Sequence, residues 1–160
     1  GIMARFPGQI DVIAVGKIRT RHWLAAQDEY LGRLEHYVTV RLVELKDSVG
    51  SVPDIVALQR EGVLLLEASR AAQRKVALTP VGEQRDSLAL AQWLRQQLEQ
   101  VGHIALLIGG PLGFAPEVLT ACHEQLALSR LTLPHELARV VLLEQLYRVM
   151  TLLNGEKYHK

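Results

Sequence analysis

The apolar run Ile104–Ile108, which ends abruptly at Gly109-Gly110-Pro111, constrains the fold more than any other stretch of this chain. A strand with one face in water alternates apolar and polar residues, and this run does not. Such a run is typical of a strand buried on both faces, in a parallel sheet between two layers of helices. The glycines and proline predict a turn at the carboxyl edge of that sheet, where open α/β sheets bind ligands.

Segments with strand and helix patterns alternate along the rest of the chain. We expect further strands over residues 10–15, 38–45, 75–79 and 126–133, with Pro80 ending the third of these. Helices are expected over residues 21–37, 54–72, 88–101, 116–125 and 134–154, with Thr20 and Ser87 as N-caps of the first and third. This order predicts an α/β fold with a mostly parallel sheet flanked by helices.

Length and composition limit the class of protein. With 160 residues, 49% of them apolar, we expect one domain over residues 1–160, in which Gly1 and Ile2 are a cloning remnant. The apolar runs are too short to cross a bilayer, and no secretory pattern is visible. Cys122 is the sole cysteine, which favours a reducing, cytoplasmic location, and no metal-binding motif is found. A net charge of +1 neither requires nor excludes a nucleic-acid partner.

The glycine turn matches none of the common nucleotide-binding motifs. "GGPLGF" lacks the dinucleotide-binding spacing, and no Lys-Ser or Lys-Thr pair follows it as in a P-loop. Two other irregular segments, 77–82 ("ALTPVG") and 128–136 ("LSRLTLPHE"), also follow expected strands. Together the three could frame a slot of backbone groups suited to an adenine ring. The alternative is a glycine-proline turn that merely reverses the chain.

Three stretches carry a family resemblance: "LLIGGPLG" (106–113), "LSRLTLPHELARVVLLEQLYR" (128–148) and the terminal "YHK". They closely resemble the ribosomal RNA large subunit methyltransferase H family. Its members are S-adenosylmethionine-dependent SPOUT (α/β-knot) enzymes that methylate N3 of a pseudouridine in 23S rRNA. The resemblance covers essentially the whole chain, from "VIAVGK" (12–17) through "REG" (60–62) to the last residue. It implies a single-domain SPOUT fold with a carboxy-terminal trefoil knot, which general topological rules would not suggest.

The resemblance also implies a site. The family's donor-binding positions fall on the three irregular segments, and Gly109 and Gly110 would clear room for the methyl donor. These positions are Leu78, Gly109, Gly110, Leu128, Ser129, Arg130, Leu131, Thr132 and Leu133. The expected catalytic group is His135, Glu144, Arg148, Tyr158, His159 and Lys160.

Methyl transfer to N3 requires removal of a proton, so a base or a stabilising cation is needed nearby. His159 is a candidate base or orienting group, and Arg148 could stabilise the anion or hold a phosphate. Each candidate has a simpler interpretation. Glu144 and Arg148 could form only a surface pair one helical turn apart, His135 could be an ordinary first-turn residue, and "YHK" a frayed end.

The last helix is apolar on more than one face, which indicates a partner, and a homodimer would satisfy it as in the family. We expect the tail of one subunit to complete the donor site of the other. Two departures bear on RNA recognition: Leu112 stands where relatives often carry an acid, and residues 46–56 contain few cations. The alternatives are a SPOUT methyltransferase acting on another RNA, such as tRNA, or a non-catalytic dimeric RNA- or nucleotide-binding module.

Overall fold

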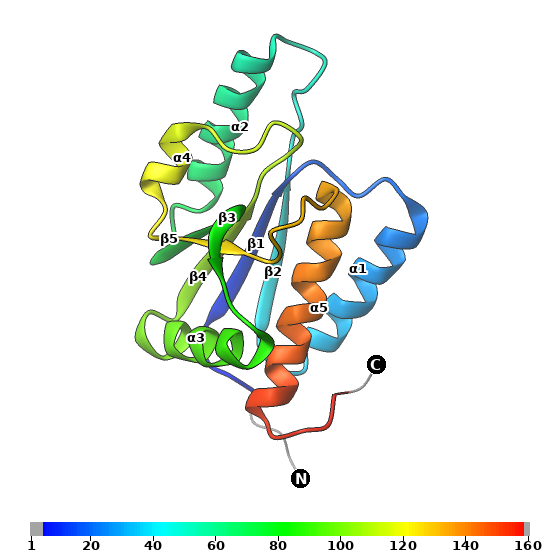
Figure 1. Ribbon diagram of the computed structural model, residues 1–160, viewed down its shortest axis with the longest axis vertical. Coiled ribbons are helices and arrows are strands. Elements are labelled where there is room, and N and C mark those ends of the chain that lie inside the picture. Colours follow the sequence, from blue (N-terminus) through cyan, green and yellow to red (C-terminus); the bar gives the residue numbers. More distant parts are fainter. Residues whose placement is uncertain (1–4, 159–160) are drawn as a thin grey trace.

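A computed structural model of the chain describes residues 5–158, and in this range five strands form one parallel sheet (Figure 1). The strand order across the sheet is β2-β1-β4-β3-β5. In chain order, the strands are β1 (Gln9–Val15), β2 (Thr39–Leu45), β3 (Arg74–Gln84), β4 (His103–Ile108) and β5 (Glu124–Ala127). The expected α/β fold with a parallel sheet is confirmed.

Helices cover both faces of the sheet. They are α1 (Arg21–Leu34), α2 (Asp54–Ala68), α3 (Ser87–Gln100), α4 (Pro116–Ala121) and α5 (His135–Leu153). One core lies between the sheet and the layer of α1, α3 and α5, and a smaller one lies under α2 and α4 (Figure 1). None of the helices in residues 5–158 has both the length and the apolar character needed to cross a bilayer.

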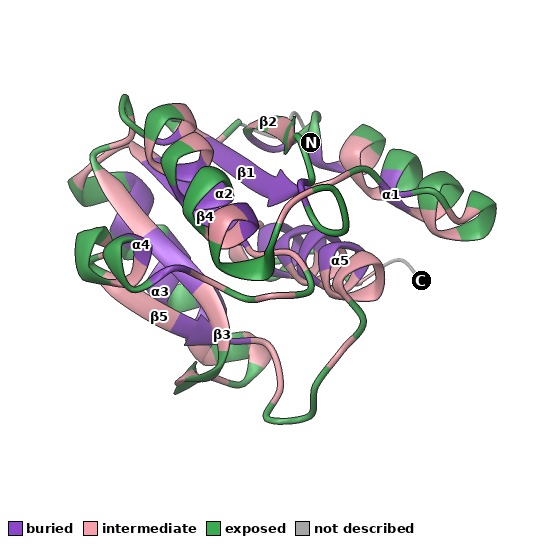
Figure 2. Cartoon of the chain, turned by 90° about the horizontal axis from the view of Figure 1, so that it is seen from above, coloured by how far each residue is buried: buried purple, intermediate pink, exposed green. Residues whose placement is uncertain are grey.

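The central strands are apolar on both sides because both layers pack on them. In β4, Ile104, Leu106 and Ile108 belong to the larger core, whereas Ala105 and Leu107 belong to the smaller one. β1 pairs with β4 and is almost completely buried (Figure 2). The prediction that residues 104–108 form a strand buried on both faces is therefore confirmed.

The structure corrects several expected boundaries. β3 does not stop at Pro80 but continues to Gln84, because the register of its pairing with β5 shifts between Leu78 and Glu83. Pro80 lies in that interruption, where its missing N–H removes no bond from the ladder. β5 ends at Ala127, so the expected strand over 126–133 is wrong, and most of it is an irregular segment.

The expected helix ends also shift. α2 ends at Ala68 and α4 at Ala121, both several residues earlier than expected. Asp86, not Ser87, caps α3, because its carboxylate accepts a 2.8 Å hydrogen bond from the backbone N–H of Ala89.

Gly82 marks a very close approach between two backbone segments. A Cβ atom at this position would lie 2.7 Å from backbone atoms of both Gln125 and Leu126, closer than real Cβ contacts. Only glycine therefore lets the end of β3 lie directly against β5.

The apolar width of α5 is explained largely within this chain. The helix packs against α1 and α3 on the larger core, and its buried residues include Val140, Leu143, Leu146 and Met150. Leu152 remains 41% exposed. The breadth of the apolar face thus gives weaker support for a partner subunit than the sequence pattern indicates.

Candidate functional site

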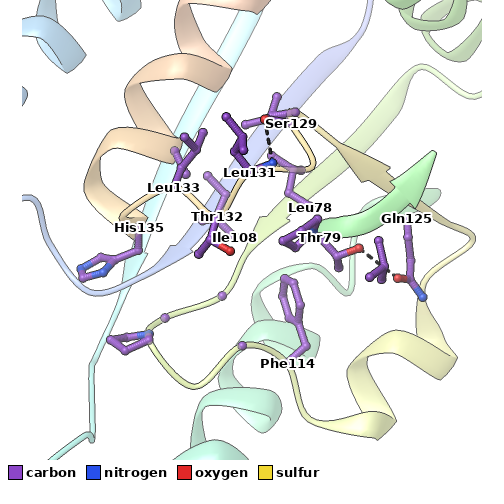
Figure 3. Close-up of a pocket in the computed structure, with 18 of the residues that line it drawn as sticks. Leu78, Thr79, Ile108, Phe114, Gln125, Ser129, Leu131, Thr132, Leu133 and His135 are labelled. Atoms are coloured by element: carbon purple, nitrogen blue, oxygen red, sulfur yellow. Dashed lines mark hydrogen bonds between the residues drawn. The ribbon is translucent and has the colours of Figure 1, made fainter. Parts of the chain in front are cut away.

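A cavity of about 410 Å³ opens where β4 and β5 end and where the pairing of β3 with β5 is interrupted, in the size range of small-molecule sites (Figure 3). Its walls come from residues 78–81 of β3, the turn after β4, the segment after β5 and the start of α5. The lining is mainly aliphatic, with an aromatic ring from Phe114. The three segments selected from the sequence therefore meet at one site.

Most of the expected donor-binding residues line this cavity. Leu78, Gly109, Gly110, Leu128, Ser129, Leu131, Thr132 and Leu133 do so. Arg130 does not line it: its side chain is exposed, and its Nε donates a 3.2 Å hydrogen bond to Gln84. Of the expected catalytic residues, His135 lines the cavity as the first residue of α5.

Several lining residues were not among the expected site residues. They are Thr79, Pro80, Val81, Ile108, Pro111, Gly113, Phe114, Leu119, Gln125 and Ala138. Six of these lie inside the segments "ALTPVG" (77–82) and "GGPLGF" (109–114), so the sequence did carry a signal for them. Gln125 belongs to β5, where its Oε1 accepts a 3.1 Å hydrogen bond from Thr79 Oγ1 across the strand pair (Figure 3).

The glycine turn is closed by its own backbone. A Cβ on Gly109 would lie 2.7 Å from the carbonyl oxygen of Gly113, and a Cβ on Gly110 would lie 3.1 Å from Val15 Cγ1. Gly113 has a φ of +77° and donates a 3.0 Å hydrogen bond to Gly110. The missing side chains at 109 and 110 thus make room for protein atoms, which corrects the interpretation that they make room for a ligand. The closed turn presents its main chain to the cavity instead.

Glu144, Arg148 and Tyr158 form a separate cluster. The Tyr158 hydroxyl donates a 2.5 Å hydrogen bond to Glu144 Oε2, which also accepts a 2.9 Å bond from Arg148. The Arg148 guanidinium stacks on the Tyr158 ring, 3.9 Å from its centroid. Burial, together with the Glu144 carboxylate, raises the pKa of Tyr158. The i,i+4 pair expected from the sequence does form, but it binds the carboxy-terminal segment as well.

This cluster and His135 are far apart within one chain. At 1.5 Å per residue, Glu144 and Arg148 lie roughly 13 and 20 Å along α5 from His135. His159 and Lys160 lie outside the described residues. A single chain therefore does not bring the expected catalytic group together. The described residues also contain no cluster of histidine, cysteine and carboxylate groups suited to a metal ion.

The start of α5 is fixed to the neighbouring turn by two charged residues. Glu136 Oε1 accepts a 3.1 Å hydrogen bond from the backbone N–H of Thr20, and this bond lowers the pKa of Glu136. Arg139 is 1% exposed and donates to Glu44 at 2.6 Å and to the Gly16 carbonyl at 2.8 Å. These contacts hold His135 at the cavity wall.

Comparisons with known proteins identify the family of the chain. Residues 9–159 match the family described as "Predicted SPOUT methyltransferase". The chain is 44% identical over 152 residues to the ribosomal RNA large subunit methyltransferase H of Anaeromyxobacter dehalogenans (strain 2CP-1), covering 95% of this chain and 99% of that protein. It is 32% identical to the protein of the same name from Bacteroides fragilis (strain ATCC 25285), covering 92% of this chain and 96% of that protein.

Solved structures share the fold at low sequence identity. A probable methylase family protein from Haemophilus influenzae Rd KW20 matches with a TM-score of 0.58 and 16% identity, covering 94% of this chain and 70% of that one. A probable methyltransferase from Bordetella pertussis Tohama I gives a TM-score of 0.57 at 17% identity, covering 89% of this chain and 95% of that one. With its sheet order, its cavity and these sequence matches together, the chain belongs to the ribosomal RNA large subunit methyltransferase H family of SPOUT methyltransferases.

Proposed function

We propose that this protein transfers a methyl group from S-adenosylmethionine to N3 of a pseudouridine in large-subunit (23S) rRNA. The observation that carries the proposal is the cavity formed by the glycine turn and the segment after β5, in a chain 44% identical to a named rRNA methyltransferase. The protein acts in the cytoplasm on the ribosome.

The cavity suits the donor in shape and in chemistry. Leu78, Ile108 and Leu133 supply apolar surface for a flat adenine ring, and the adjoining turns supply backbone donors and acceptors for its edge. Leu131 N–H donates a 3.0 Å bond to Ser129 Oγ, which fixes the shape of the segment after β5 (Figure 3). When bound, the donor supplies an electrophilic methyl group for in-line displacement.

The chain's own contribution is to position the base and to manage its proton. His135 is at the cavity wall and can contact a bound base or an attached phosphate. Arg148 stabilises negative charge that develops when N3 loses its proton, and His159 accepts or orients that proton.

Arg148 and His159 reach the cavity through a homodimer, in which the tail of one subunit completes the donor site of the other. Support comes from the separation of roughly 20 Å between His135 and Arg148 along a single α5. Two exposed apolar residues at the cavity, Val81 and Leu131, are 87% and 75% accessible in the lone chain. The close crossing at Gly82 fits the trefoil knot that we also propose.

The direct test incubates the protein with labelled S-adenosylmethionine and ribosomes that lack the modification, followed by mass spectrometry to locate the methyl group. We expect one methyl group on N3 of a single pseudouridine of the large-subunit rRNA. Methylation of tRNA instead would support the alternative SPOUT substrate. Donor binding without transfer to any RNA would support a non-catalytic binding module and overturn the proposal.

Deletion of Lys157–Lys160 tests the division of roles. Because every residue that lines the cavity within one chain precedes the tail, and the Tyr158 hydroxyl contacts α5, the deletion should abolish methyl transfer but leave the dimer and most of the donor affinity intact. Calorimetry with the donor and sedimentation measure the last two. A parallel loss of donor binding and transfer would contradict a separate role for the tail.

A further inference from the structure

Residues 16–22, which we call the basic turn, comprise the turn between β1 and α1 and the first two residues of α1, with the cationic side chains exposed and an apolar side chain buried between them. Lys17, Arg19 and Arg21 are exposed, whereas Ile18 between them is only 5% exposed and packs inside. Alternation of this kind presents three positive charges on the outer side of one short segment. The chain as a whole has a net charge of only +1, so this concentration is local.

These cations have no direct ionic partner in the part of the chain that the structure describes. Within residues 5–158, none of the three forms an ion pair. The carboxylates of Glu44 and Glu136 nearby are already bound to Arg139 and to the Thr20 N–H. Asp47 is the acidic residue beside Gly16, and its Oδ1 accepts the backbone N–H of Val49. The charge of the basic turn is therefore available to a partner.

The basic turn is held rigidly at both ends. Its first residue donates to the Leu45 carbonyl at 2.7 Å, and the same residue, Gly16, accepts a 2.8 Å bond from the buried Arg139. Farther along, the Thr20 N–H is bound to Glu136 at 3.1 Å. A backbone fixed in this way loses little further conformational entropy when the segment binds a partner.

The basic turn also lies beside the cavity. Its anchor Glu136 directly follows His135, which lines the cavity, and the preceding Val15 packs against Gly110 of the glycine turn. In Figure 1 the connection from β1 to α1 passes the start of α5, on the same edge of the sheet as the turn after β4. A polyanion bound by the basic turn would thus pass the entrance of the cavity.

We propose that the basic turn contacts backbone phosphates of the RNA substrate and aligns the RNA with the cavity. The inference rests on the proposed function, because it assigns a surface to the substrate of that site. RNA is favoured over an acidic protein because three unpaired, side-by-side cations match a regular line of phosphates and need no further specificity. These residues lie outside the cavity lining, so they position the RNA without taking part in donor binding.

The test compares two triple variants of the full-length protein with equal loss of charge. One is Lys17→Gln/Arg19→Gln/Arg21→Gln, and the other, as control, is Arg60→Gln/Arg70→Gln/Arg95→Gln, three exposed arginines on α2, after α2 and on α3. Affinity for protein-free large-subunit rRNA is measured between 50 and 200 mM salt. Each lost phosphate contact lowers the slope of log affinity against log salt by about 0.7 to 0.9, so the first variant should lose about 2 to 3 units of slope.

Over that fourfold salt range, the salt-induced loss of affinity should shrink by roughly 20- to 40-fold in the first variant. The control should keep the wild-type slope, and both variants should bind S-adenosylmethionine as the wild type does. Equal slopes in the two variants would overturn the proposal. So would a first variant that binds protein-free rRNA normally but loses affinity for intact subunits, since this would indicate an acidic protein partner.

The two proposals fail in different ways. If the wild type shows a steep salt slope that the first variant loses, yet methylates no RNA, the basic turn stands and the proposed activity does not. If the wild type methylates rRNA but the two variants have equal slopes, the activity stands and the basic turn does not.

Discussion

Substituting Gly109 by alanine perturbs the glycine turn at its tightest point. The new Cβ would lie 2.7 Å from the Gly113 carbonyl oxygen and 3.0 Å from its carbon, both of them backbone atoms that no rotamer change can move. Relief requires the turn over 109–113 to open by several tenths of an ångström. Overpacking of this kind costs about 1–3 kcal/mol of the free energy of unfolding. Because the same backbone lines the cavity, we expect donor affinity to fall at least about tenfold, or about 1.4 kcal/mol.

The chain offers two matched controls for this substitution. Gly32 lies within α1 with nothing within 4 Å of its Cβ position, so Gly32→Ala should raise stability by about 0.5–1 kcal/mol and leave donor affinity unchanged. Gly113 also has free space, but its φ of +77° disfavours any side chain, so Gly113→Ala should cost about 1–2 kcal/mol through backbone strain. Thermal unfolding gives the stabilities and calorimetry gives the donor affinities. If Gly109→Ala binds the donor as tightly as Gly32→Ala does, the turn does not form the donor site.

Two further predictions concern buried carboxylates outside the cavity. Burial opposes ionisation of Asp11, but hydrogen bonds from Gln9, Arg41 and His103 lower its pKa. The ionised carboxylate therefore adds to the free energy of unfolding above the pKa of Asp11 in the unfolded chain, and this contribution is lost as the pH falls through the folded pKa. Wild type should therefore lose more of its free energy of unfolding in acid than Asp11→Asn does, so that the stability difference between the two proteins narrows as the pH falls; an equal pH dependence of the two would contradict this. Glu61 is 1% exposed, and neither carboxylate oxygen has a well-aligned hydrogen bond among the described residues. Burial raises its pKa against the smaller opposing effect of the Ser48 backbone, so its ionisation destabilises the fold as pH rises through that pKa. Glu61→Gln should raise the free energy of unfolding by about 1–3 kcal/mol at pH 8 with little gain at pH 4, and an unchanged or lower value at pH 8 would refute it.

The central strand and the turns around the cavity could be predicted because their signals are local. Residues 104–108 lack alternation, and this feature alone indicates burial on both faces. The glycine-proline segment after β4 marks the place where the chain leaves the sheet, and the one within β3 marks the interruption of its pairing with β5. Since carboxyl ends of parallel strands share one edge, their meeting at one cavity follows from the topology.

Features that depend on several distant segments could not be predicted. From the sequence, a charged residue such as Arg139 is expected on the surface of its helix. It is buried because its guanidinium donates hydrogen bonds to Gln27, Glu44 and the Gly16 carbonyl. The segment 128–133 has the composition of a strand but forms a cavity wall, because β5 ends at Ala127. The glycines indicated that some group lies very close to the backbone at Gly109. The sequence did not show whether that group is a ligand or, as in the structure, the Gly113 carbonyl.

A crystal structure of the protein with S-adenosylmethionine tests the central claim most directly. We predict the donor in the cavity between the glycine turn and residues 128–133, with its adenine edge bonded to main-chain atoms. Density for the donor at any other place, with this cavity empty at saturating donor concentration, would contradict the account.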